Sequence, residues 1–242
     1  MKPASAYRSI VVLTGAGVSA ESGLATFRDS NGLWNNHRIE DVATPEAFLR
    51  NPKMVWEFYS ARRRGALSAK PNAAHHALAA FAKSSEDWGV EFTLVTQNVD
   101  GLHESAHRKT GAAMPLTMHG RVCESRCTQC GRVFPDEKIY EAGQLPQSQC
   151  CRKLLRPHIV WFGEMPLFIP EIERRLKACD LFVTIGTSGN VYPAAGFLMQ
   201  AKAAGATTMC LNKEKIPQDR FVDEHLEGPA TQLVPEFFKS LS

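Results

Sequence analysis

The segment IVVLTGAGVSAESG, residues 10–23, decides the fold of this chain. Its first four residues, Ile10–Leu13, are the aliphatic and β-branched kind that fills a strand buried on both faces. Glycines follow at once, where a backbone can approach a pyrophosphate closely and the next helix offers free N–H groups. Because the third glycine departs from the Gly-x-Gly-x-x-Gly spacing, a tight turn without a ligand is the alternative. The segment therefore indicates a buried strand ending in a turn suited to a dinucleotide.

The same strand pattern recurs along the chain, at Phe92–Thr96, Leu181–Ile185 and Thr207–Leu211. Helical patterns lie between these strands, and the predicted helices cover Pro45–Leu49, Pro52–Leu67, Asn72–Lys83, Glu171–Ala178 and Pro193–Ala204. Strands that alternate with helices predict an α/β fold built on a mostly parallel sheet.

Two stretches break this alternation. Residues 121–157 are polar, rich in cysteine and poor in periodicity, so we interpret them as a small inserted module that ends in a linker at Leu155–Pro157. Residues 26–70 form a long excursion of loop and helix that we assign to the same smaller lobe. The large domain would then comprise residues 1–25, 71–120 and 158–242.

Composition narrows the class of protein. The 242 residues fit one large domain or two small ones, and 44% hydrophobic residues exclude a wholly disordered chain. A net charge of +3 is too small to indicate nucleic acid or an anionic membrane as a partner. Neither a transmembrane stretch nor a secretory signal is recognisable. We therefore expect a cytoplasmic protein that binds neither nucleic acid nor membranes.

Five of the seven cysteines fall between residues 123 and 151. Clustered cysteines with a Cys-x-x-Cys pair indicate a metal rather than a disulfide framework in a reducing compartment. The second pair is irregular, because its cysteines are adjacent and Ser148 stands three residues before the last one. We expect one structural zinc ion per chain, bound by Cys127, Cys130, Cys150 and Cys151. Because the second pair is irregular, the fourth ligand is uncertain, and Cys123 is the substitute for it.

Polar side chains follow the predicted strands where α/β sheets place their ligands. Gln97, Asn98 and Asp100 come directly after Phe92–Thr96 and are suited to orient a ribose and a carboxamide, or else to cap the next helix. A loop of small residues, Gly186–Gly189, follows a later strand in the same way. His119 precedes the cysteine-rich module, and a lone histidine more often has a structural role than a catalytic one.

Six motifs together resemble the sirtuin family of NAD-dependent protein deacylases, from about Val11 to Val234. They are GAGVSAESGLATFRDSNGLW (15–34), TQNVDGLH (96–103), MHG (118–120), CTQC (127–130), LLRPHIVWFGE (154–164) and VTIGTSGNVYPAAG (183–196). The resemblance implies a Rossmann-type parallel sheet with helices on both faces. It also implies a small lobe made of a zinc-binding module and a helical module, with NAD and substrate between the lobes.

The resemblance also assigns roles to individual residues. NAD, the co-substrate, would be bound by Gly15, Ala16, Gly17, Ser19, Glu21, Ser22, Phe27, Arg28, Trp34, Gln97, Asn98, Asp100, Gly186, Thr187, Ser188, Asn212, Glu214 and Ala230. His119 would be the general base and Asn98 a second catalytic residue. The substrate peptide would pair as an added strand with Val160, Trp161, Phe162 and Gly163.

The reaction implied is a transfer of the acyl group from a protein lysine to NAD. The acyl-lysine oxygen attacks the ribose carbon as nicotinamide leaves, and His119 then accepts a proton from a ribose hydroxyl. That hydroxyl attacks the resulting imidate, and with one water consumed the products are lysine, nicotinamide and O-acyl-ADP-ribose. The zinc would be structural and distant from this chemistry.

One further pair narrows the acyl group. Tyr59 and Arg62 are three residues apart on a predicted helix, so they share a face. The pair resembles the one that marks the desuccinylase and demalonylase subclass of the family, where an arginine fork holds an acyl carboxylate. Activity on succinyl, malonyl and acetyl groups is expected. The alternative is a solvated face made of Arg62, Arg63 and Arg64.

Two other functions remain open at this point. On the same scaffold a mono-ADP-ribosyltransferase or NAD hydrolase would let a protein group or water capture the ribose. The other is a non-enzymatic NAD sensor, and the presence of His119, Asn98 and Asp100 together argues against it. The expected partners are acylated lysines of proteins, and a monomer is the simplest assembly.

Overall fold

The larger of two sheets forms the body of the molecule. The computed structural model describes residues 2–25 and 37–242. Six parallel strands lie in the order β3-β2-β1-β7-β8-β9, which, renumbered along the chain, is the 3-2-1-4-5-6 order of dinucleotide-binding Rossmann sheets. Their bounds are β1 Ser9–Thr14, β2 Glu91–Thr96, β3 Leu116–Thr117, β7 Leu181–Ile185, β8 Thr207–Asn212 and β9 Glu224–Glu227. The predicted strands are the four central ones, and the α/β prediction is confirmed.

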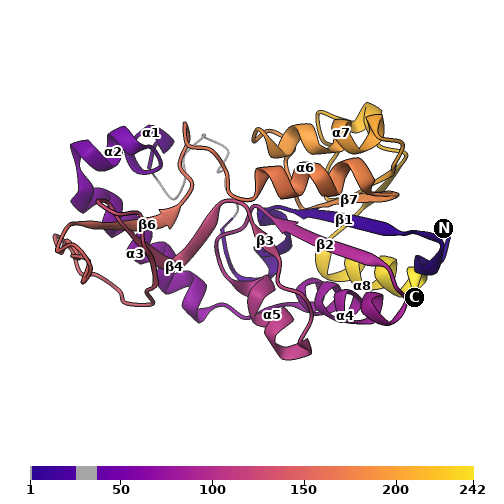
Figure 1. Ribbon diagram of the computed structural model, residues 1–242, viewed down its shortest axis with the longest axis horizontal. Helices are drawn as coiled ribbons and strands as arrows, with labels where there is room; N and C mark the ends of the chain where they lie inside the picture. Colours follow the sequence, from indigo (N-terminus) through magenta and orange to yellow (C-terminus); the bar gives the residue numbers. More distant parts are fainter. Residues whose placement is uncertain (1, 26–36) are drawn as a thin grey trace.

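Helices cover both faces of this sheet, as predicted (Figure 1). One face carries α4 (Ala73–Asp87), α5 (Leu102–Thr110) and α8 (Ala230–Leu241), and the other carries α6 (Ile169–Ala178) and α7 (Phe197–Ala203). Because side chains alternate along a strand, Ile10 and Val12 pack with α4 and α8, whereas Val11 and Leu13 pack with α6 and α7. Each face of β1 is therefore apolar, which explains its unbroken hydrophobic run.

A second lobe lies beyond the carboxyl ends of the central strands (Figure 1). It contains the antiparallel sheet β5-β4-β6, with β4 Gly120–Cys127, β5 Val133–Pro135 and β6 Leu155–Ile159. It also contains α1 (Ile39–Val42), α2 (Pro45–Arg50) and α3 (Pro52–Ser68). The helices and the sheet share one hydrophobic cluster. The division of the chain into a large domain and modules at 26–70 and 121–157 stays a prediction.

Side-chain caps explain where helices α2, α3 and α4 begin. The Thr44 hydroxyl accepts from the N–H of Ala47 at the start of α2, and the Asn51 side chain accepts from the N–H of Met54 at the start of α3. Asn72 caps α4 in the same way. Within residues 2–25 and 37–242, none of the helices has the length and apolar character needed to cross a membrane.

Some boundaries differ from the prediction. Leu155–Pro157 is not a linker, because these residues belong to β6 and pair with β4. The helix predicted over Pro193–Ala204 begins instead as a short 3-10 turn, Ala194–Gly196, and becomes α-helical at Phe197.

Candidate active site

A cleft of about 470 Å³ lies between the large sheet and the small lobe, and most of the predicted site residues line it. From the large domain it is lined by Gly15, Ala16, Gly17, Ser19, Gln97, Asn98, Asp100, His119, Gly186, Thr187, Ser188, Asn212 and Glu214. From the small lobe and the segment after β6 it is lined by Tyr59, Arg62, Val160, Trp161, Phe162 and Gly163. Residues far apart in the sequence are thus brought to one site at the strand ends.

The floor of the cleft is backbone, because glycines of two strand ends pack directly together. The N–H of Gly17 donates to the Gly186 carbonyl over 2.8 Å, which joins the turn after β1 to the turn after β7. A Cβ placed on Gly17 would stand 2.8 Å from the Cα of Gly186, so a side chain there would part the two turns. Gly186 itself has a φ of +59°, which favours glycine. Such a floor fits the close approach of a pyrophosphate.

Ser19 connects the turn after β1 to the polar segment after β2. Its hydroxyl donates to the Asp100 carboxylate over 2.7 Å and accepts from the Asn98 amide over 3.2 Å. The same amide donates to the Gly15 carbonyl over 3.1 Å. Burial raises the pKa of Asp100, while hydrogen bonds from Leu102 and Ser19 and the charge of Arg62 oppose that rise. These side chains are therefore held in place before any ligand arrives.

A second polar link runs to the turn after β7. The Gln97 amide donates to the Thr187 hydroxyl over 3.0 Å, and the Asn212 amide donates to the Thr187 carbonyl over 2.9 Å. Three strand ends, those of β2, β7 and β8, are thereby fixed relative to one another along the cleft.

His119 is oriented by the main chain. Its Nδ1–H donates to the carbonyl of Gln97 over 3.1 Å, which leaves Nε2 as the acceptor in the neutral ring. Burial lowers the pKa of His119 below its usual value of 6.5, although the bond to Gln97 opposes this. The ring is therefore neutral near pH 7 and equipped to accept a proton.

The three consecutive arginines of α3 have three different environments, so they do not form a solvated face. Arg62 lines the cleft, Arg63 is fully buried and Arg64 is exposed. Tyr59 is also fully buried, and burial raises its pKa, which keeps the phenol neutral. Burial lowers the pKa of Arg62, and the charge of the Asp100 carboxylate opposes this. A phenol and a guanidinium thus face the same cavity.

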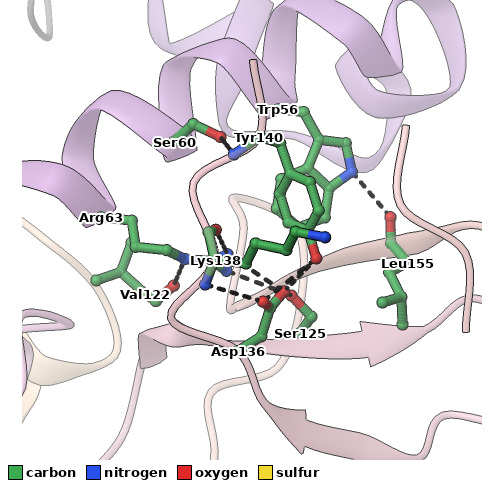
Figure 2. Close-up of polar contacts among 9 residues, drawn as sticks. All are labelled: Trp56, Ser60, Arg63, Val122, Ser125, Asp136, Lys138, Tyr140 and Leu155. Atoms are coloured by element: carbon green, nitrogen blue, oxygen red, sulfur yellow. Dashed lines mark hydrogen bonds and ion pairs between the residues drawn. The ribbon is translucent and has the colours of Figure 1, made fainter. Parts of the chain in front are cut away.

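Arg63 anchors α3 to the small sheet (Figure 2). Its Nε donates to the Val122 carbonyl over 2.8 Å, and its Nη1 lies 3.2 Å from the Asp136 carboxylate. The guanidinium also lies against the rings of Trp56 and Tyr140, at 5.5 and 5.8 Å from their centroids. This anchor fixes the rotation of α3, and so the direction in which Arg62 projects.

The four predicted metal ligands form a cluster at the far end of the small lobe. The sulfur atoms of Cys127, Cys130, Cys150 and Cys151 all lie within 4.8 Å of one another. Zinc holds four thiolates about 3.8 Å apart when its Zn–S bonds are ~2.3 Å long, so the cluster fits a tetrahedral zinc ion. Ser148 lies beside the cluster, with its hydroxyl oxygen 3.2 Å from the Cys127 sulfur.

Some predicted residues do not line the cleft. The Glu21 carboxylate accepts from the N–H and hydroxyl of Thr231 and so caps α8. Ser22 accepts from the Asn72 amide, and Ala230 is buried in the core at the start of α8. Phe27, Arg28 and Trp34 lie outside the described residues.

Several residues that line the cleft were missed, including Ala43, Val99, Glu164 and Tyr192. Val99 lies inside a motif that was recognised for its polar neighbours, and Glu164 ends another motif. Ala43 carries no chemical signal in the sequence.

Comparisons with known proteins agree with this geometry. The model of the Sir2 family matches residues 15–193. The NAD-dependent protein deacylase SIR2rp3 of Leishmania major is 53% identical over 234 residues, which are 95% of this chain and 94% of that protein. An NAD-dependent protein deacylase of Caulobacter vibrioides is 47% identical over 237 residues, 96% of each chain.

Solved structures show the same fold. A Sir2 homologue in complex with NAD superposes with a TM-score of 0.87 at 38% identity and covers 98% of this chain and 91% of that one. A Sir2 protein with a p53 peptide and NAD+ gives a TM-score of 0.82 at 27% identity and covers 98% and 95%. With the family model, the relatives and the cleft in agreement, this chain belongs to the Sir2 family.

Proposed function

We propose that this protein is an NAD-dependent protein-lysine deacylase that prefers acyl groups ending in a carboxylate. The observation that carries the proposal is that one cleft holds a neutral, oriented histidine, the strand-end polar residues and the Tyr59–Arg62 pair. The relatives named as deacylases and the family structures with NAD and peptide support the NAD-dependent part.

The large-domain side of the cleft fits NAD. The backbone floor at Gly15, Gly17 and Gly186 suits the pyrophosphate, and Asn98 and Asp100 are placed to hold a ribose. When bound, NAD supplies a ribose carbon with a good leaving group, the cationic pyridine ring. The chain contributes a rigid site, because Asn98 and Asp100 are already bonded to Ser19.

His119 would act as the general base. Nε2 accepts a proton from a ligand hydroxyl, and the bond from Nδ1 to Gln97 stabilises the ring in that orientation as it becomes charged. The lowered pKa keeps the acceptor form populated at neutral pH.

The small-lobe side of the cleft would select the acyl group. A carboxylate at the end of a succinyl or malonyl chain pairs with the Arg62 guanidinium, and the Tyr59 hydroxyl donates a second bond. An acetyl group fits the same cavity but makes neither contact. The pairing of charges therefore favours the acidic acyl groups.

The peptide backbone would lie along residues 160–163. Three N–H groups there already donate within the chain, from Val160 to His119, from Trp161 to Glu164 and from Phe162 to Ala43. A peptide paired here as an added strand would therefore have to use main-chain groups other than these three N–H groups. A cytoplasmic location and a monomeric state stay predictions.

The experiment compares Arg62→Met with Arg64→Met, a matched change at the exposed neighbour. We expect Arg62→Met to lower kcat/KM on a succinyl-lysine peptide roughly 30-fold, which corresponds to a charge-assisted hydrogen-bonded pair, and to change the acetyl-lysine value far less. Arg64→Met should resemble the wild type on both peptides. Equal losses on the two peptides for Arg62→Met would refute the carboxylate preference.

A further inference from the structure

We propose that the Trp161 side chain is a specificity-determining positioning residue, which holds the Tyr59 phenol so that its hydroxyl is directed at the acyl carboxylate. The inference rests on the proposed preference for acidic acyl groups. This role of the indole side chain is separate from the main-chain pairing of residues 160–163 with a substrate peptide.

The central contact joins two buried side chains from different parts of the lobe. The indole Nε1–H of Trp161 donates to the phenol oxygen of Tyr59 over 3.0 Å. Tyr59 comes from α3, and Trp161 follows β6, 102 residues later. Both side chains are nearly or wholly buried, and both residues line the cleft. A hydrogen bond at this place therefore orients a group that faces the substrate.

The direction of this bond determines what the phenol offers the substrate. A phenol oxygen both accepts and donates, whereas an indole nitrogen only donates. Because the Tyr59 oxygen accepts from Trp161, its own hydrogen points away from the indole. The raised pKa of Tyr59, caused by burial, keeps that hydrogen in place throughout the working pH range. The tyrosine is thereby set as a donor, which is the role that a carboxylate needs.

Trp161 is itself held on two sides. The Arg156 guanidinium carbon lies 3.4 Å from the centroid of the indole, which is a close cation–π contact. Arg156 in turn donates to both carboxylate oxygens of Glu164, at 2.6 and 2.8 Å, and Glu164 accepts from the N–H of Trp161 over 2.9 Å. Phe48 packs on the indole with ring centroids 5.3 Å apart. The donor that orients Tyr59 is therefore rigid.

This arrangement predicts an effect that depends on the acyl group. A succinyl or malonyl group uses the phenol hydrogen, so it loses binding when the phenol is no longer held. An acetyl group has no carboxylate and makes no use of that hydrogen. Loss of the indole N–H should therefore lower the ratio of kcat/KM on succinyl-lysine to kcat/KM on acetyl-lysine, which we call the acyl ratio.

The test measures the acyl ratio in Trp161→Phe, Tyr59→Phe and the double variant, each with NAD and matched peptides. Phenylalanine keeps an aromatic ring at this position and removes the N–H donor together with part of the ring area. Trp56→Phe is the matched control, because Trp56 also donates its indole N–H, but to the Leu155 carbonyl over 2.9 Å and away from the cleft. Thermal unfolding of each variant records any general loss of stability.

We expect Trp161→Phe to lower the acyl ratio about fivefold through a higher KM for the succinyl peptide, which is the effect expected for the loss of one buried hydrogen bond. Trp56→Phe should leave the acyl ratio within about twofold of the wild-type value. Tyr59→Phe should lower it at least as much, and the double variant no further, because both changes remove one interaction. The proposal is overturned if Trp161→Phe keeps the wild-type ratio while Tyr59→Phe lowers it, or if the two effects simply add. If neither Tyr59→Phe nor Arg62→Met alters the ratio, the acyl preference itself fails.

Discussion

The Nδ1–H of His119 donates to the main-chain carbonyl of Gln97 across 3.1 Å. Because a carbonyl oxygen only accepts, this bond leaves Nε2 without hydrogen in the neutral ring. Gln97 also links to Thr187, so the histidine is oriented by a segment that is itself fixed to the turn after β7. A base held in this way needs no rearrangement when a proton arrives.

Substitution of the base separates binding from chemistry. His119→Ala should lower kcat for deacylation by at least about 100-fold, the contribution typical of general-base catalysis. NAD binding, measured by calorimetry, should persist, because Gly15, Ser19 and Asn98 are untouched. A variant that turns over acyl peptide at the wild-type rate would contradict the assignment.

The pH dependence of the rate follows from the same residue. Only neutral His119 accepts a proton, so the rate falls as pH drops through its pKa, which burial places below 6.5. We expect kcat/KM to stay nearly constant between pH 7.5 and about 6.5 and to decline at lower pH. A half-maximal rate reached at pH 7 or above would mean that the histidine pKa is not lowered.

The sequence predicted the large domain better than the small lobe, for a physical reason. The central strands have long apolar runs, and β1 and β7 are each followed by a glycine turn whose backbones touch. Both the fold and the cofactor-binding side are therefore visible in short motifs. In the small lobe, buried positions of both a strand and a helix carry charged residues. Arg156 on β6 pairs with Glu164, and Arg63 on α3 pairs with Asp136. A charged residue at a buried position interrupts the apolar pattern of a strand, which is why the sequence of Leu155–Pro157 resembles a linker.

The roles of individual side chains are also hard to predict when their partners lie far away in the sequence. Glu21 lies inside a recognised motif, yet its carboxylate caps α8, 210 residues away. The three arginines 62–64 are identical in the sequence, and only the rotation of α3 places one in the cleft, one in the core and one in solvent.

The buried arginine should be critical for stability. Arg63→Met removes the partner of the nearly buried Asp136 carboxylate, and breaking a buried pair in this way costs about 3–5 kcal/mol of unfolding free energy. Arg64→Met, at the exposed next position, should change it by less than about 0.5 kcal/mol. Urea unfolding compares the two, and equal stabilities would show that the contacts of Arg63 in Figure 2 do not anchor α3.

Zinc should be present at about one ion per chain, held by the cysteine cluster. Elemental analysis of Cys130→Ser should show that the metal is lost. Thermal unfolding should show a lower unfolding temperature, because four thiolates tie the ends of the small sheet together. Cys123→Ser is the control, since Cys123 lies outside the cluster, and it should keep the metal. Full retention of zinc in Cys130→Ser would contradict the ligand set.

The most direct measurement is mass spectrometry of the products formed from NAD and matched acetyl-lysine and succinyl-lysine peptides. We predict free lysine peptide, nicotinamide and O-acyl-ADP-ribose in equal amounts, with faster turnover of the succinyl peptide and no turnover without NAD. Deacylation that proceeds equally well in the absence of NAD, or ADP-ribose attached to protein in place of the acylated product, would contradict it.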